Sequence, residues 1–374
     1  MPRIGRLALV CGQLDATDAT VYTENLVRGL NASGVIMRAV GPGGPLARRL
    51  KEAGVELTPF PLMGKSIVGG IGSVRAAQNV YSFLPDLIHA TTPEAYSAAK
   101  KAAVNARVPL VVTVHEFIDG AADLPWKPGD APLAIVPSEA LRENLVNDGQ
   151  MPKGHVIVVP YGLDLSIYPP RPPERPPSGS SEWGRGLNQE RTTTIGCMSP
   201  LIEGKGIELF IRAAKLVLDA GKDAEFFIAG SGPKEEQFRA LAHDVGSRGR
   251  ATFLGSDIRP EQLMKNLDVF VSASRREALG MSLLQAMACS RPVIAAAAGG
   301  TFGVVNDGET GFLVPPGDER ALADRMTQLT ADARMRSEMG RAGREKLEEE
   351  FSLDQMIKQT EAAYARALEE PQLK

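Results

Sequence analysis

The feature that most constrains the fold is an alternation of short apolar runs with helical patterns, which fills both halves of the chain. In the first half the apolar runs have the length of buried strands, and the segments between them repeat apolar residues at helical spacing. We expect strands at 7–10, 36–40, 87–89, 110–114, 134–136 and 156–159, and helices at 21–32, 45–53, 94–105 and 138–148. This rhythm predicts a doubly wound parallel sheet.

The alternation stops at a segment rich in proline, serine and glycine and then begins again. Residues 169–191 lack apolar periodicity, which indicates a linker or surface insertion. Further strands are expected at 192–198, 225–229, 251–254, 269–271, 293–295 and 311–314, with helices at 206–220, 318–329 and in the charged C-terminal region. The sequence therefore predicts α/β domains at 1–168 and 192–350, joined by this linker, and a final helical segment at 351–374.

Bulk properties exclude several kinds of partner and compartment. The 374 residues carry a formal charge of −3 and only 5% aromatic residues, which argues against nucleic acid because phosphate contacts need a basic face. The three cysteines lie far apart in apolar segments and suit a reducing cytoplasm. No signal peptide and no apolar run of about 20 residues is apparent. We expect a cytoplasmic protein, and peripheral contact with a membrane stays open.

Residues 268–318 predict a site for a phosphorylated ligand. Val269–Val271 form an expected strand, Glu277 lies in the following loop, and Gly280 opens a helix. The unpaired amides of Gly280, Met281 and Ser282 would favour an anion at the helix N-terminus. We expect a phosphate to bind there without a metal ion, beside a carboxylate that accepts hydrogen bonds from hydroxyl groups.

This stretch resembles the nucleotide-sugar site of the family 4 glycosyltransferases, retaining enzymes with the two-domain GT-B fold. Glu277 matches the first of two family glutamates, whereas Gln285 occupies the place of the second, which binds ribose. The Gly299-Gly300 pair and the segment 307–314 also match, while 301–303 replaces the usual Pro-Glu neighbourhood.

Residues 195–215 carry a second match. The Lys205-Gly206 pair resembles the family pair whose lysine grips the nucleotide diphosphate, but Pro200 stands where the family has an arginine and supplies neither charge nor donor. Arg276 is a candidate replacement for that cation. Three further glycines resemble family residues that border the nucleotide: Gly230, Gly232 and Gly255.

The N-terminal half resembles the acceptor side of the family. His115 ends a strand in the family's T-x-H pattern, near the reacting sugar, and His89 ends the preceding strand. Gly12 follows the first strand, but residues 13–18 replace the usual Gly-Gly loop. Tyr161 replaces an asparagine in the turn that links the domains.

The resemblance implies two Rossmann-like doubly wound domains facing across a cleft, with the last helix crossing back to the first domain. It implies a metal-independent hexosyltransferase that needs no cofactor and moves a sugar from a UDP- or GDP-linked donor to a hydroxyl group. Glu277, His115 and Lys205 would be its catalytic residues. The acceptor would be a glycan, a lipid-linked or a small molecule, in polysaccharide or glycolipid synthesis for the cell envelope, at the inner face of the membrane.

Two alternatives from other classes remain open. Pro200, Gln285 and the altered first loop suit a non-catalytic nucleotide-sugar-binding subunit, and a GT-B epimerase would share the architecture. A nicotinamide-binding domain needs G-x-G-x-x-G and a P-loop needs G-x-x-x-x-G-K-[ST], and neither pattern is present. We find neither the Asp-x-Asp element of metal-dependent transferases nor metal-ligand spacing among the histidines and cysteines.

Overall fold

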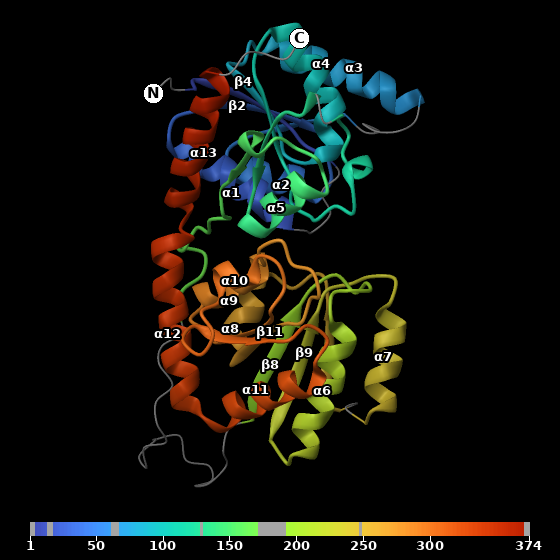
Figure 1. The fold of residues 1–374 in the computed structure, drawn as a ribbon, viewed down its shortest axis with the longest axis vertical. Coiled ribbons are helices and arrows are strands. Elements are labelled where there is room, and N and C mark those ends of the chain that lie inside the picture. The colour runs from blue at the N-terminus through green and yellow to red at the C-terminus, as the bar shows by residue number, and fades with distance from the viewer. Residues whose placement is uncertain are drawn as a thin grey trace. The chain divides into compact units, whose positions relative to one another are not determined.

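The computed structural model describes residues 4–12, 18–60, 67–127, 130–170, 192–246 and 249–369. The chain divides into two compact units (Figure 1). Unit 1 comprises residues 1–162 and 351–374, and unit 2 comprises residues 163–350. The C-terminal helix thus belongs to unit 1, and residues 163–168 belong to unit 2 rather than to the first domain. The expected linker at 169–191 lies outside the described residues, apart from its first two prolines.

Unit 1 contains a seven-stranded sheet in which all neighbouring strands are parallel. In spatial order the strands are β3 (Leu57–Pro59), β2 (Ile36–Gly41), β1 (Arg6–Val10), β4 (Leu87–Ala90), β5 (Leu110–Thr113), β6 (Leu133–Val136) and β7 (Val156–Val158). The order reverses between β1 and β4, and ligands of doubly wound sheets bind at the carboxyl ends beside such a reversal.

Helices of unit 1 fill the crossovers between its strands. They are α1 (Asp18–Ala32), α2 (Pro45–Glu52), α3 (Ile67–Ser82), α4 (Tyr96–Ala106) and α5 (Glu139–Asn147), together with the short turn η1 (Pro93–Ala95). The last helix, α13 (Leu353–Glu369), packs beside α1, as the adjacent red and blue ribbons of Figure 1 show.

Unit 2 contains a six-stranded parallel sheet. Its spatial order is β10 (Ala251–Gly255), β9 (Ala224–Ala229), β8 (Thr193–Met198), β11 (Val269–Ser272), β12 (Val293–Ala296) and β13 (Gly311–Val314). Its helices are α6 (Ile207–Asp219), α7 (Glu235–Asp244), α8 (Pro260–Asn266), α9 (Met281–Ala288), α10 (Thr301–Val304), α11 (Glu319–Ala331) and α12 (Ala333–Glu350). The reversal of this sheet lies between β8 and β11.

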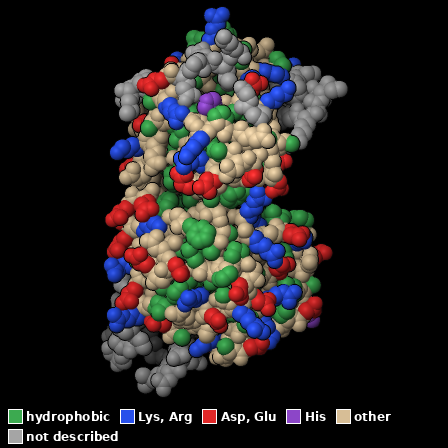
Figure 2. All heavy atoms as spheres, in the orientation of Figure 1, with side chains coloured by type: hydrophobic (Ala, Val, Ile, Leu, Met, Phe, Trp, Pro, Cys, Tyr) green, Lys and Arg blue, Asp and Glu red, His purple; other side chains and the backbone are tan. Residues whose placement is uncertain are grey.

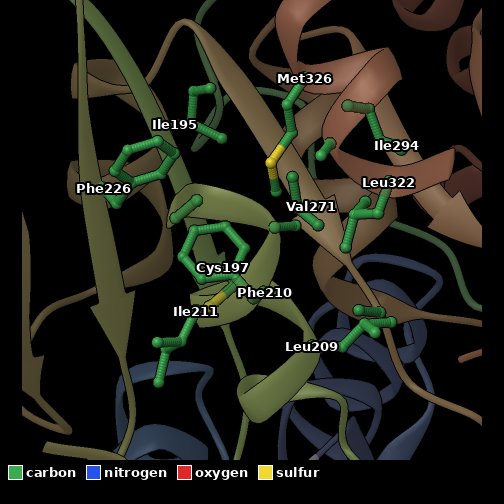
Figure 3. Close-up of a cluster of buried hydrophobic side chains, with 14 of the residues drawn as sticks. Ile195, Cys197, Leu209, Phe210, Ile211, Phe226, Val271, Ile294, Leu322 and Met326 are labelled. Atoms are coloured by element: carbon green, nitrogen blue, oxygen red, sulfur yellow. The ribbon is translucent and has the colours of Figure 1, made fainter. Parts of the chain in front are cut away.

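The core of unit 2 forms where α6 and α11 pack together on the sheet. Phe210 on α6 meets Phe226 on β9 edge to face, with ring centroids 6.0 Å apart, and Leu322 and Met326 project from α11 (Figure 3). Each such side chain contributes about 1.5–3 kcal/mol when it is fully buried. This packing fixes the sheet whose carboxyl edge carries the expected ligand site.

The alternation of apolar runs with helical patterns in the sequence predicts the two parallel sheets correctly, and it misses only individual elements. Every expected strand is present within one or two residues. The expected helix at 138–148 is also present as α5, and Ser138 is its N-cap, accepting a hydrogen bond from Leu141 N at 3.2 Å. Helix α3 is not predicted by the sequence pattern, because the glycines within Ile67–Ser82 interrupt its apolar periodicity. The short edge strand β3 is also missed.

Candidate functional site

The expected donor-site residues of unit 2 lie at the carboxyl ends of β8 and β11. The loop after β8 leads through Lys205 into α6, and the loop after β11 leads through Glu277 into α9. Arg275 N donates to Gly204 O at 3.0 Å and joins the two loops. A methyl group on Gly206 would lie 2.1 Å from the carbonyl oxygen of Ala273, so only glycine permits this approach. The structure thus brings the two main sequence motifs together.

Lys205 is partly buried, one residue before the N-cap of α6. It forms no hydrogen bond or ion pair with another residue of the part of the chain that the structure describes. The helix dipole disfavours a cation at this position unless an anion lies between them. Lys205 and the helix end therefore form a setting suited to a shared anionic ligand.

Glu277 lies against the start of α9. Gly280 is the N-cap of this helix with a φ of +100°, and a methyl group there would lie 3.5 Å from Glu277 Cγ. The Glu277 carbonyl accepts a hydrogen bond from Gly300 N at 2.8 Å, which attaches the Gly299-Gly300 loop. The carboxylate side chain and the amides at Met281 and Ser282 are thereby held in one neighbourhood.

Gln285 is almost completely buried on α9, with 1% of its surface exposed. Its Nε2 donates to the Tyr168 hydroxyl at 3.1 Å. The sequence does not indicate Tyr168 as part of the site, because its partner lies 117 positions away and no motif contains it.

The three glycines expected near the nucleotide lie at the carboxyl ends of the next two strands: Gly230 and Gly232 follow β9, and Gly255 is the last residue of β10. Gly230 N donates to Gly255 O at 2.8 Å, and Leu201 N donates to Ser231 O at 2.9 Å, one residue before Gly232. The loops after β8, β9 and β10 therefore support one another. Contact of these glycines with a nucleotide stays a prediction.

Cations near the loop that contains Pro200 have acidic neighbours. Lys234 Nζ lies 2.9 Å from Glu203 Oε2, and Arg275 Nη2 lies 3.6 Å from Glu208 Oε1. Lys234 and Arg275 lower the pKa of Glu203. Arg276, the candidate replacement for the family arginine, is exposed, and its backbone carbonyl accepts from Ser274 Oγ at 3.0 Å. Its contact with a phosphate stays a prediction.

In unit 1, His115 follows β5 and is held by two hydrogen bonds. Its Nε2 lies 2.9 Å from Thr91 O, which can only accept, so Nε2 carries the proton and Nδ1 accepts from the Tyr161 hydroxyl at 2.9 Å. Burial lowers the pKa of His115 to about 4, although Thr91 O and the Glu94 charge act in the opposite direction. His115 is therefore neutral at pH 7, and its fixed tautomer favours orienting the strand end over proton transfer.

His89 lies inside unit 1 with no exposed surface. Its ring nitrogens are each 2.7 Å from a hydroxyl oxygen, that of Tyr364 on α13 and that of Thr113 on β5. Burial, and secondarily the neighbouring His115, lower its pKa to about 3. This geometry favours a structural role, in which His89 ties α13 to the sheet, over the acceptor-side role expected from sequence.

Gly12 lies at the reversal point of the unit 1 sheet, where β1 and β4 end together. A methyl group on Gly12 would lie 2.2 Å from Thr92 Oγ1 and 3.4 Å from Glu94 Oε2, so the loop after β1 touches the turn after β4. Of residues 13–18, which replace the family's Gly-Gly loop, 13–17 lie outside the described residues. The acceptor role of Gly12 stays a prediction.

On the face drawn in Figure 2, blue and red side chains are interspersed. Within the described ranges, no helix is long and apolar enough to cross a membrane, and no three acidic, histidine or cysteine side chains form a metal-binding group.

Comparison with known proteins identifies both halves of the chain. Residues 19–162 match the glycosyl transferase 4-like domain, and residues 184–346 match glycosyl transferases group 1. The sulfoquinovosyl transferase SQD2 of Arabidopsis thaliana is 28% identical over 311 residues, 78% of this chain and 58% of that protein. A GDP-mannose-dependent monoacylated phosphatidylinositol monomannoside mannosyltransferase of Corynebacterium glutamicum is 33% identical over 208 residues, 53% of each chain. The chain thus spans between half and three fifths of the length of these curated relatives.

Solved structures share the fold at low sequence identity. HepE of Anabaena, in complex with UDP and glucose, superposes with a TM-score of 0.80 at 20% identity, over 96% of this chain and 99% of that one. A glycosyltransferase of Rickettsia africae gives 0.78 at 16% identity, over 97% and 98%. The matches to both domain models, the two doubly wound sheets and the motifs around Lys205 and Glu277 place this chain in the family 4 glycosyltransferases of GT-B fold.

Proposed function

We propose that this protein is a retaining glycosyltransferase that moves a sugar from a nucleoside-diphosphate sugar to a hydroxyl group of an acceptor. The observation that carries the proposal is the juxtaposition of the Lys205 and Glu277 loops at the reversal point of the unit 2 sheet. A carboxylate and a helix N-terminus meet there with a partly buried lysine that has no acidic partner among the described residues. This combination suits a sugar joined to a diphosphate.

In this proposal the donor diphosphate lies between Lys205 and the amides of Gly280, Met281 and Ser282. These groups stabilise the charge that develops on the leaving phosphate as the glycosidic bond breaks. Glu277 accepts hydrogen bonds from hydroxyl groups of the transferred sugar, and Gln285 binds the ribose.

The transfer step exchanges one bond for another on the same face of the sugar. The bond from the anomeric carbon to the phosphate oxygen breaks, the bond to the acceptor oxygen forms, and the acceptor proton passes to the departing phosphate. His115 takes no proton in this scheme, because its Nε2 already carries one and its Nδ1 accepts from Tyr161. It orients the end of β5, where the acceptor side is expected.

We propose further that the reaction needs no metal ion, since Lys205 and the helix end supply the positive charge. UDP- and GDP-linked sugars are both candidate donors: HepE was solved with UDP, and the Corynebacterium relative is named for GDP-mannose. A glycan or lipid-linked acceptor and a role in cell-envelope synthesis are supported by the names of relatives that act on lipids or capsular polysaccharide. The inner membrane face would be the place of such a reaction.

The experiment is a panel assay. The purified chain is incubated with UDP- and GDP-linked hexoses in the presence of chelator and candidate acceptors, and the released nucleotide is measured. We expect release that depends on one donor and on an acceptor, with the anomeric configuration retained in the product by NMR. Inversion would refute the retaining assignment, and activity only on addition of Mg²⁺ or Mn²⁺ would refute metal independence.

A non-catalytic nucleotide-sugar-binding subunit is the second candidate. Pro200 removes the family's arginine from the diphosphate site, and Gln285 replaces a carboxylate with a neutral amide. Both changes weaken donor binding without removing Lys205 or Glu277. Thermal stabilisation by a nucleotide sugar without release of nucleotide, across the whole acceptor panel, would favour this alternative.

A further inference from the structure

Gln285 stands where the family resemblance implies a carboxylate, and the structure fixes one end of its amide. A carboxylate can only accept hydrogen bonds, whereas an amide donates at one end and accepts at the other. Gln285 Nε2 donates to the Tyr168 hydroxyl at 3.1 Å. No residue within the described ranges donates to Gln285 Oε1, so the carbonyl oxygen is left to accept.

Tyr168 is attached to α9 by a second contact that does not involve its hydroxyl. Arg344 on α12 donates from Nη1 to the Tyr168 carbonyl at 2.8 Å and also to the carbonyl of Ala288, the last residue of α9. The Arg344 side chain is 13% exposed and is paired with Glu348 at 2.6 Å. The backbone of Tyr168 is therefore anchored beside the helix that carries Gln285.

We propose that Tyr168 is a positioning residue that fixes the Gln285 amide, so that its carbonyl oxygen accepts a hydrogen bond from the ribose hydroxyls of the nucleotide. The inference rests on the proposed function, because it requires that a nucleotide binds beside Gln285. Without the phenol, the amide could rotate and present its NH₂ group in place of the oxygen. Tyr168 thereby compensates for the loss of the carboxylate and gives the site its preference for a ribose diol.

The test compares nucleotides that differ by one ribose hydroxyl. Dissociation constants of UDP and 2′-deoxy-UDP, or of GDP and 2′-deoxy-GDP if only the purine binds, are measured calorimetrically on the full chain. We expect the wild type to bind the ribonucleotide about 10-fold more tightly than the deoxynucleotide. The buried Gln285 oxygen would be left without a hydrogen-bond donor in the complex with the deoxynucleotide, which costs free energy. Gln285→Leu should bring the ratio close to 1, and Tyr168→Phe should lower it to about 2-fold or less.

Two variants separate positioning from a general structural effect. Gln285→Glu presents an acceptor at both oxygens, so adding Tyr168→Phe to it should change the ratio by less than 2-fold. Tyr96→Phe is the matched control, because Tyr96 is also buried and donates its hydroxyl proton to the Asp130 carbonyl at 3.2 Å, but it lies in unit 1. It should leave the ratio unchanged.

The anchoring of the Tyr168 backbone by Arg344 predicts that the phenylalanine variant folds, and a thermal melt checks this. A wild-type ratio in folded Tyr168→Phe would overturn the inference while leaving the proposed function intact. The inference would also be overturned if Tyr168→Phe reduced discrimination equally in the wild type and in the Gln285→Glu variant. If neither UDP nor GDP binds the wild type, the proposed function fails, and the inference fails with it.

Discussion

Acidification should destabilise unit 1 because two of its histidines are buried in the neutral form. Burial lowers the pKa of His89 to about 3 and that of His115 to about 4, against about 6.5 in an unfolded chain. The groups that face them are the Tyr364 and Thr113 hydroxyls at His89, and Tyr161, Thr91 O, the Tyr22 ring and the Glu94 charge at His115. The folded state therefore binds fewer protons than the unfolded state below pH 6.5, and its stability falls as the pH falls.

The size of the effect at pH 5 depends mainly on the unfolded chain. An unfolded histidine with a pKa of about 6.5 is stabilised by protonation at pH 5 by about 2 kcal/mol, while the folded groups remain largely neutral. The loss between pH 7.5 and pH 5 is therefore about 2 kcal/mol for each histidine and about 4 kcal/mol for both. This contribution is fully present above pH 6.5 and is lost progressively toward pH 4.

The assay is urea denaturation at pH 7.5 and pH 5, comparing the wild type with His89→Gln. Carboxylates titrate in both proteins and contribute equally to the loss of stability. The difference between the two losses of unfolding free energy is therefore the contribution of His89. We expect the variant to lose about 2 kcal/mol less than the wild type on acidification, even if it is less stable at pH 7.5. Equal losses in both proteins would refute the claim that His89 is buried uncharged.

Other variants test single contacts. Lys205→Met should weaken the binding of UDP or GDP about 10-fold or more, as measured by calorimetry, without lowering the melting temperature. Pro200→Arg should strengthen nucleotide binding if the loop admits the side chain beside the diphosphate. Tyr161→Phe removes the hydroxyl that donates to His115 Nδ1 and should therefore raise the pKa of His115, which histidine NMR would report. Tyr22→Phe is the control, because the Tyr22 hydroxyl is hydrogen-bonded to Thr113 instead, and it should change the pKa of His115 less. Ser138→Ala should destabilise unit 1 by about 1 kcal/mol in denaturant melts, because it deletes the cap of α5.

Much of the fold follows from local rules that act within a few residues. The apolar runs at Val269–Ser272 and Val293–Ala296 form buried strands, and the strand-to-helix turn at Ser138 is capped as its side chain predicts. Helix α3 escapes prediction because its glycines weaken the helical pattern while packing against α4 still forms the helix.

The site is predictable to the extent that it consists of contiguous motifs. Lys205 and Glu277 lie in loops that the topology brings together, because β8 and β11 are neighbours and parallel strands end at one edge. The partners of polar side chains are not predictable. Tyr364 reaches His89 across 275 positions and Tyr161 reaches His115 across 46, and no local pattern records such pairs. For the same reason the sequence does not indicate that His89 is buried against Tyr364, and the acceptor-side role of His89 stays a prediction.

The central claim is that the Glu277 carboxylate accepts hydrogen bonds from the transferred sugar at a site that binds a nucleoside diphosphate. The most direct measurement is the turnover of Glu277→Gln with the donor that the wild type uses, together with its affinity for the free nucleotide. We predict a loss of turnover of about 100-fold with nucleotide affinity unchanged within about 3-fold, because the carboxylate contacts the sugar and not the diphosphate. Wild-type turnover in that variant would contradict the account.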